Sequence, residues 1–139
     1  MASARWIPMS RVDGHSMLPT LRAGQVVLTR PRAAGSVRRG HIVLAQRQGL
    51  PLVVKRVAAV AGDVVEMTAA RVHVNINRAD PEATSDSGTS VAIWTVPSGH
   101  YFLTGDNSGW STDSRSWDQP FVRHEEIAGV VLFTGASAS

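Results

Sequence analysis

Short apolar segments separated by turn-forming residues run through most of this chain, and they limit the folds that it can adopt. The segments are rich in Val, Ile, Leu and aromatic residues, and Gly, Pro, Asp, Asn or Ser lie between them. Segments of this length and spacing favour strands over helices. Helix is expected to be minor, limited to a turn near Val122–Ile127. The sequence therefore predicts a mostly β fold, with strands at Gln25–Arg30, His41–Gln46, Leu52–Val60, Val64–Met67, Arg71–Asn75, Val91–Val96, Tyr101–Thr104 and Ile127–Phe133.

Length and composition predict one domain over residues 1–139. The chain has 139 residues, of which 43% are hydrophobic, so it can bury a core without disulfides or a structural metal. We expect a small β excursion at about 66–97, in which the polar segment Ala79–Ser90 forms a mobile loop. The chain has no cysteine, so cysteine usage does not indicate a redox compartment.

Lys55 is the only lysine in the chain, and the other thirteen basic side chains are arginines. An arginine-rich composition explains why lysine is rare, but it does not explain why one lysine lies inside the apolar segment Leu50–Val57. The alternation of a strand places Lys55 on the same face as Val53 and Val57. Burial there would lower the pKa of its amine from about 10.4 toward roughly 7 to 8. Lys55 is therefore a candidate general base.

Ser16 is the candidate nucleophile. It lies 39 residues before Lys55, in the segment Gly14-His15-Ser16-Met17-Leu18-Pro19-Thr20-Leu21, whose small residues and proline predict a turn that exposes the hydroxyl. A serine activated by a lysine is a known catalytic pair. The alternative is that Ser16 is an ordinary turn residue and Lys55 a structural one.

A histidine base is a second alternative, because the chain contains five histidines. None lies in a motif of a Ser-His-Asp enzyme, and the side chains of the neighbours His15 and Ser16 point in opposite directions on an extended segment. The histidines are 24 to 32 residues apart along the sequence and no cysteine accompanies them, so we predict no metal site. They are His15, His41, His73, His100 and His124.

A third segment, Tyr101–Trp117, is dense in small polar residues and by itself reads as a turn-rich loop. Taken with the other two segments, it resembles the catalytic domain of type I signal peptidases, which are serine-lysine proteases. A Ser-Met-x-Pro turn also occurs in self-cleaving repressors of the SOS type, so the last block distinguishes the two. The four blocks that carry the resemblance are Gly14–Leu21, Arg39–Val43, Lys55–Val57 continuing into Ala61-Gly62-Asp63, and Gly105-Asp106-Asn107 with Ser111, Asp113, Ser114 and Arg115.

The resemblance implies a fold of antiparallel β-sheets and a role for each matching residue. Ser16 would attack the peptide bond, Lys55 would take and return its proton, and Ser111 would hold the lysine amine in position. The oxyanion would be bound by the backbone at Ser16 and Gly14. Some family members carry a serine hydroxyl at the position of Gly14, so this chain departs from them there.

The remaining family positions imply support rather than chemistry. Met17 would form part of the substrate cleft, Asp106 would hold its loop, and Asp113 and Arg115 would pair near the dyad. The resemblance implies no metal and no organic cofactor.

The function implied by the resemblance is the removal of signal or leader peptides after small residues. Three alternatives stay open: a soluble maturation protease for one specific precursor, a self-cleaving regulator like the SOS repressors, and a binding module that has lost its chemistry. The intact set of Ser16, Lys55 and Ser111 argues against the last of these.

Basic side chains are concentrated in the first part of the chain, where residues 1–60 hold nine arginines and Lys55 against one aspartate. Arg30, Arg32, Arg38 and Arg39 could attract anionic lipid, although a solvated loop in an arginine-rich protein explains them equally well. With few aromatics and no recognisable module, we predict no nucleic-acid binding.

The chain has no apolar run of the about 20 residues that a spanning helix needs. The resemblance implies a membrane-associated protein on the extracytoplasmic face, and Trp6, Ile7 and Met9 could enter the lipid interface. The alternative is a cytoplasmic location, since no anchor is visible in the sequence.

Overall fold

The computed structural model describes residues 3–68, 72–75, 90–107, 112–115 and 117–134, and almost all of its regular structure is strand. The prediction of a mostly β fold is confirmed. Two short 3-10 helices, η1 (Arg32–Ala34) and η3 (His124–Glu126), also lie in this part of the chain. Its strands are β1 (Met9–Arg11), β2 (Val26–Arg30), β3 (Ile42–Ala45), β4 (Val53–Val60), β5 (Val64–Thr68), β6 (Val72–Val74), β7 (Ser90–Thr95), β8 (His100–Thr104), β9 (Phe121–Arg123) and β10 (Ile127–Thr134).

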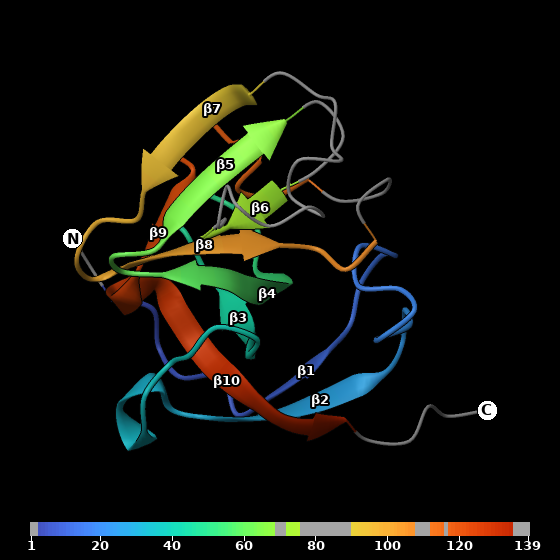
Figure 1. Ribbon diagram of the computed structural model, residues 1–139. Coiled ribbons are helices and arrows are strands. Elements are labelled where there is room, and N and C mark those ends of the chain that lie inside the picture. Colours follow the sequence, from blue (N-terminus) through green and yellow to red (C-terminus); the bar gives the residue numbers. More distant parts are fainter. Residues whose placement is uncertain (1–2, 69–71, 76–89, 108–111, 116, 135–139) are drawn as a thin grey trace.

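The strands form two antiparallel sheets. The larger sheet has the order β1-β2-β10-β3-β4-β8-β9, and the smaller has the order β6-β5-β7. Strand β10 lies inside the large sheet, where it pairs with β2 on one side and with β3 on the other. It therefore joins the pair β1-β2 to the other four strands. In Figure 1 the small sheet lies next to β4 and β8, at the opposite end of the molecule from β1 and β2.

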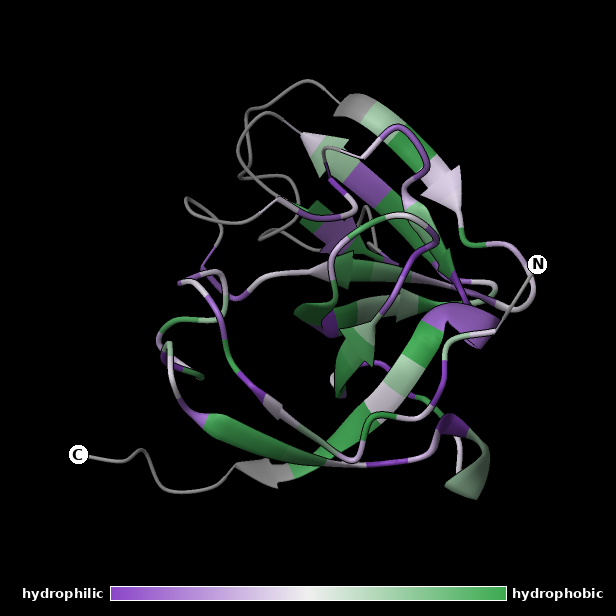
Figure 2. Ribbon diagram, turned by 180° about the vertical axis from the view of Figure 1, so that it is seen from behind, coloured by the Kyte–Doolittle hydropathy of each residue, from purple (hydrophilic) through white to green (hydrophobic). Residues whose placement is uncertain are grey.

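Apolar residues on alternate positions explain the burial of these strands. In β4, Lys55, Val57 and Ala59 are buried. Their neighbours along the strand, such as Val54 and Arg56, are only half-buried. Figure 2 shows hydrophobic colours along the strands and hydrophilic colours mainly in the connecting loops. The strands are therefore placed by the period of two that their sequences carry.

An aromatic cluster packs between part of the small sheet and the large sheet. Phe102 of β8 is fully buried, and its ring centroid lies 5.6 Å from that of Trp94 in β7 and 6.4 Å from that of Phe121 in β9. Val65 and Val96 are buried in the same cluster. Burial of these side chains holds the small sheet against the large one.

Two strands were not predicted from the sequence. Strand β1 has the sequence Met-Ser-Arg, with no apolar alternation, and it is held by antiparallel pairing of Ser10 with Val27. Strand β9 covers Phe121–Arg123, so the predicted helical turn at Val122–Ile127 is wrong at its beginning, and only His124–Glu126 is a 3-10 turn. The predicted mobile loop Ala79–Ser90 and the predicted start of a strand at Arg71 lie outside the described residues, apart from Ser90 in β7.

Two arginines of the basic segment bind backbone carbonyl groups. Arg32 donates from Nη1 to the carbonyl oxygens of Ala4 at 2.8 Å and Ile127 at 2.9 Å. Arg30 donates to the carbonyl oxygens of Pro31 and Gly35. Arg32 therefore connects segments that are distant in sequence, whereas Arg30 stabilises the local turn that follows it.

Strands β2 and β10 approach each other closely at Gly129. A Cβ atom added to Gly129 would lie 2.5 Å from Oγ1 and 2.8 Å from Cβ of Thr29. Thr29 cannot move away easily, because its hydroxyl donates to the carbonyl oxygen of Ile7 and accepts a hydrogen bond from the Trp6 indole. Only glycine fits at this position.

We predict that Gly129→Ala destabilises the fold by about 1–3 kcal/mol, because the new methyl group overpacks the contact with Thr29. Urea unfolding followed by circular dichroism measures the change. Gly35→Ala is the matched control, since its Cβ would meet only the flexible Arg30 guanidinium at 3.4 Å. Equal stability of the two variants would contradict the prediction.

Candidate active site

Ser16 lies in a turn whose neighbouring side chains are anchored in the core. Met17 is 1% exposed and Leu21 is fully buried, and the amide of Leu21 donates to the carbonyl oxygen of Met17 at 2.9 Å. Ser16 itself is half-buried. The buried neighbours fix the turn, and they leave the serine at the edge of the core.

A second loop holds the backbone of Ser16. Asn107 donates its amide N–H to the carbonyl oxygen of Ser16 at 2.7 Å and its side-chain Nδ2 to that of His15 at 3.1 Å. Since both carbonyl groups accept from one residue, Asn107 ties the nucleophile turn to residues 105–107, which follow β8.

Lys55 is buried in β4, opposite Val43 of β3, with 4% of its surface exposed. Burial lowers the pKa of its amine below the ordinary value, because it disfavours the ammonium form. The carboxylate of Asp113 raises this pKa and the guanidinium of Arg115 lowers it, and burial exceeds both effects. The amine is therefore easier to deprotonate than that of an exposed lysine.

The two groups that act on Lys55 form a bidentate ion pair. Arg115 donates from Nε to Oδ1 of Asp113 at 2.8 Å and from Nη2 to Oδ2 at 2.6 Å. Asp113 is fully buried, and it also accepts the amide N–H of Gly105 at 2.7 Å. Ser114 accepts the amide N–H of Leu103 at 2.8 Å, so this segment is fixed beside β8.

A second ion pair connects β4 to the nucleophile turn. Arg56 donates to both carboxylate oxygens of Asp106, at 2.8 and 2.7 Å, and the hydroxyl of Thr20 donates to Asp106 at 2.5 Å. Arg56 also donates to the carbonyl oxygen of Gly40 at 2.8 Å. Asp106 therefore links the strand of Lys55 to the turn of Ser16.

The structure describes all but one of the site residues that the sequence predicts. Ser111 lies outside the described residues. Gly14 is exposed, with φ of +81° and no atom within 4 Å of an added Cβ, so its backbone rather than crowding favours glycine. Within the described ranges, no three His, Asp or Glu side chains cluster as metal ligands.

Three residues of this arrangement were missed. Arg56 could have been found as the polar neighbour of Lys55 on the opposite face of the strand, and Asn107 as part of the Gly-Asp-Asn block. Thr20 lies in the Gly14–Leu21 block, but nothing in the sequence indicated its partner Asp106, which is 86 residues away.

The family model described as "Signal peptidase, peptidase S26" matches residues 1–135 of the chain. The chain belongs to this family. It is 34% identical over 140 residues to signal peptidase I of Bacillus licheniformis, with 88% of this chain and 73% of that protein covered. It is 35% identical over 114 residues to the mitochondrial ATP-independent inner membrane protease subunit 1a of Arabidopsis thaliana, covering 78% and 60%.

A third relative is signal peptidase I of Pseudomonas aeruginosa, at 27% identity over 167 residues, where 87% of this chain corresponds to 58% of that protein. The chain thus spans less than two thirds of the length of that signal peptidase. A solved signal peptidase I from Enterococcus faecalis is similar with a TM-score of 0.51 at 23% identity, covering 69% of this chain and 97% of that one. The resemblance drawn from the sequence blocks, and the fold it implies, are confirmed.

Among the residues that the structure describes, no helix of this peptidase-family chain has the length and apolarity to cross a membrane.

We predict that Asp106→Asn destabilises this peptidase-family domain by about 1–3 kcal/mol, because it leaves Arg56 without its charged partner. Partial burial alone raises the pKa of Asp106, but hydrogen bonds from Arg56 and Thr20 and the charge of Arg56 bring it below the ordinary 3.8. A carboxylate whose pKa is lowered by folding stabilises the fold at a pH above its ordinary pKa. This stabilisation is lost as the pH falls below the ordinary pKa and through the lowered one.

The difference between wild type and Asp106→Asn should therefore be largest near neutral pH and shrink below about pH 4. Urea unfolding across this range measures it. Asp118→Asn, at an exposed aspartate, is the control. A difference that grows on acidification would contradict the role given to Asp106.

Because Lys55 is the only lysine, ¹³Cε-lysine labelling gives one side-chain NMR signal in this protein. We predict that its titration midpoint lies below the ordinary 10.5, because the amine is buried. Arg115→Gln should move the midpoint upward, since it removes a positive charge and leaves the Asp113 carboxylate without its pair.

Arg38→Gln is the control for this titration, because Arg38 lies on an exposed loop and binds Ser36. It should leave the midpoint unchanged. A wild-type midpoint at or above 10.5 would show that burial does not control this amine.

Proposed function

We propose that this chain is the catalytic domain of a serine endopeptidase that removes signal or leader peptides, with Ser16 as nucleophile and Lys55 as general base. The observation that carries the proposal is the burial of Lys55, whose pKa is lowered, on a strand that Asp106 links to the turn of Ser16. A buried amine of this kind is what a lysine base requires near neutral pH. Membership of the signal peptidase family supports the same function.

In the proposed reaction, the neutral amine of Lys55 takes the proton of the Ser16 hydroxyl as Oγ attacks the scissile carbonyl carbon. The oxyanion accepts hydrogen bonds from the backbone at Ser16 and Gly14, and one such donor contributes about 10²–10³ in rate. Lys55 then returns the proton to the leaving amine. The neutral amine of Lys55 next takes a proton from water, whose oxygen attacks the acyl carbon, and gives that proton to Oγ of Ser16 as the bond between the acyl carbon and Oγ breaks.

Ser111 is proposed to hold the Lys55 amine in position, because a four-carbon side chain is otherwise poorly directed. Met17 is proposed to border the substrate cleft. Met17 packs in one apolar cluster with Leu52 and Val54. Val54 lies in β4, the strand of Lys55, and Leu52 directly precedes this strand. Leu52 and Val54 are half-buried, so they would offer a shallow apolar surface to the small side chains that precede the cleavage site.

We propose a membrane-associated location, in keeping with a relative that is named as an inner membrane protease. Trp6 and Met9 are 49% and 61% exposed, and each lies within two residues of an arginine, Arg5 or Arg11. Exposed aromatic and apolar side chains next to arginines suit an anionic lipid surface.

We predict that Ser16→Ala and Lys55→Ala each lower cleavage of a signal-peptide-like substrate by at least about 10³-fold, since either variant removes one half of the dyad. The substrate has Ala at the third and first positions before the scissile bond, and cleavage is followed by mass spectrometry with anionic vesicles present and absent. Faster cleavage with vesicles would support membrane association, and equal rates would oppose it.

His15→Ala is the control and should retain activity, with circular dichroism showing that each variant is folded. Activity in Lys55→Ala would rule out the dyad. Loss of activity in His15→Ala alone would favour a histidine base. A folded wild type that leaves this peptide intact would favour a specific precursor or a binding module.

A further inference from the structure

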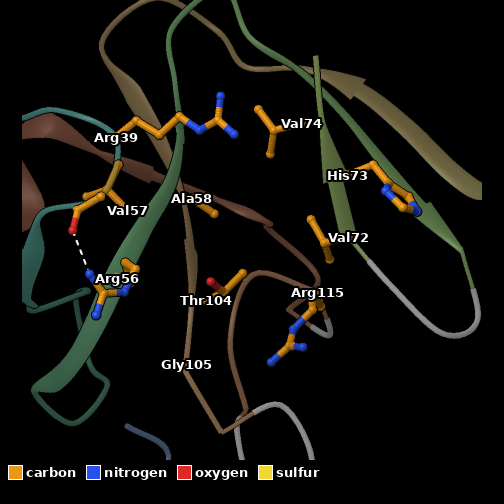
Figure 3. A pocket seen from close by; sticks show the side chains of 11 residues that line it. Arg39, Arg56, Val57, Ala58, Val72, His73, Val74, Thr104, Gly105 and Arg115 are labelled. Carbon is orange, nitrogen blue, oxygen red and sulfur yellow. Dashed lines mark hydrogen bonds between the residues drawn. The ribbon is translucent and has the colours of Figure 1, made fainter. Parts of the chain in front are cut away.

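A cavity of about 590 Å³ lies between the two sheets, beside β4. Ala58 of β4 and Val72 and Val74 of β6 form its apolar sides, and Arg39, Arg56 and Arg115 bring three guanidinium groups to it. We call it the arginine cavity. In Figure 3, Arg39 reaches toward Val74 at one end and Arg115 lies at the other.

The three arginines differ in how many N–H groups they have left for a ligand. Arg56 uses Nε and Nη2 on Asp106 and Nη1 on the carbonyl oxygen of Gly40. Arg115 binds Asp113 through Nε and Nη2, which leaves Nη1. Among the described residues, Arg39 makes no salt bridge. Its charge helps to lower the pKa of Asp63, which does not line the cavity. Arg39 and Nη1 of Arg115 are therefore the donors available to an anion.

The arginine cavity lies close to the nucleophile turn. Gly105 lines the cavity, and Asn107, two residues later, holds the carbonyl group of Ser16. Two residues of extended chain span at most about 7 Å. A peptide bound at Ser16 therefore reaches the cavity within about two to four residues of the scissile bond.

One face of β4 gives the direction. Val54 lies on the same face as Arg56 and Ala58, because strand residues alternate. Val54 packs in the cluster of Met17, whereas Arg56 and Ala58 line the arginine cavity. A substrate with its small side chains against the half-buried Val54 thus directs the residues after the scissile bond toward the arginines.

We propose that the arginine cavity binds an acidic side chain located about two to four residues after the scissile bond, on the part of the precursor that is released. The carboxylate binds Arg39, since a guanidinium matches a carboxylate in shape and charge, and Arg115 at the other end of the cavity adds positive charge. The methylene groups of the acidic side chain lie against Val72, Val74 and Ala58. This inference rests on the proposed peptidase function.

Matched peptides test the proposal. All have Ala at the third and first positions before the scissile bond, and they differ only in carrying Glu, Gln or Lys at the third position after it. We expect kcat/KM for the Glu peptide to exceed that for the Gln peptide by roughly three- to tenfold, with the Lys peptide below both. High salt should reduce the ratio, because it screens a partly exposed ion pair.

Arg39→Gln should lower the Glu-to-Gln ratio to about one. Arg38→Gln is the matched control, since the neighbouring Arg38 donates to Ser36 and does not line the cavity. This variant should keep the wild-type ratio. Thermal unfolding of both variants shows whether a change in ratio comes from lost folding.

The outcomes separate the cavity from the catalytic proposal. Equal cleavage of the three peptides by wild type overturns the acidic subsite and leaves the peptidase function standing. No cleavage of any peptide overturns the peptidase function, and the subsite with it. If the peptides are cleaved equally and Arg39→Gln, but not Arg38→Gln, loses binding to phosphatidylglycerol vesicles, the cavity binds lipid phosphate and the proposal is wrong.

Discussion

The carboxylate of Asp106 connects the parts of the molecule that must meet at the candidate active site. It accepts two hydrogen bonds from Arg56, next to Lys55 on β4, and one from Thr20 in the turn of Ser16. A catalytic pair needs its atoms held within about 0.5 Å, and loops alone rarely achieve this. Because Asp106 and Arg56 are only partly buried, their pairing compensates for the water they lose without the full cost of a buried ion pair.

The charges around Lys55 are arranged so that burial decides its protonation. Asp113 would strongly favour the ammonium form if its charge were uncompensated in the core. Instead, Arg115 donates three hydrogen bonds to it, from the backbone amide and from two guanidinium nitrogens. This ion pair fixes residues 113–115, and the charge of Arg115 opposes the effect of Asp113 on the pKa of the Lys55 amine.

Local patterns in the sequence predicted the features that depend on neighbouring residues, namely most of the strands and the buried lysine. The longer strands carry an apolar alternation, and an isolated lysine inside one of them drew attention to Lys55. Strand β1 escaped prediction because backbone pairing with β2, rather than its own side chains, holds it. The partners of Asp106 lie 50 and 86 residues away, and no single sequence specifies such pairs. The Tyr101–Trp117 block indicated that Asp106 mattered, but only the fold supplied Arg56 and Thr20 as its partners.

Lys55 and Arg56 are consecutive residues whose side chains serve opposite faces of β4. A deletion or insertion of one residue inside the strand would exchange the two faces, because side chains alternate with a period of two. The guanidinium would then enter the core and the amine would meet Asp106. Length changes in this chain are therefore tolerable in the hairpin of residues 46–52, before the strand begins, but not between Val53 and Val57. The alternation of side chains thus explains why the length of the strand is constrained while the length of the preceding loop is not.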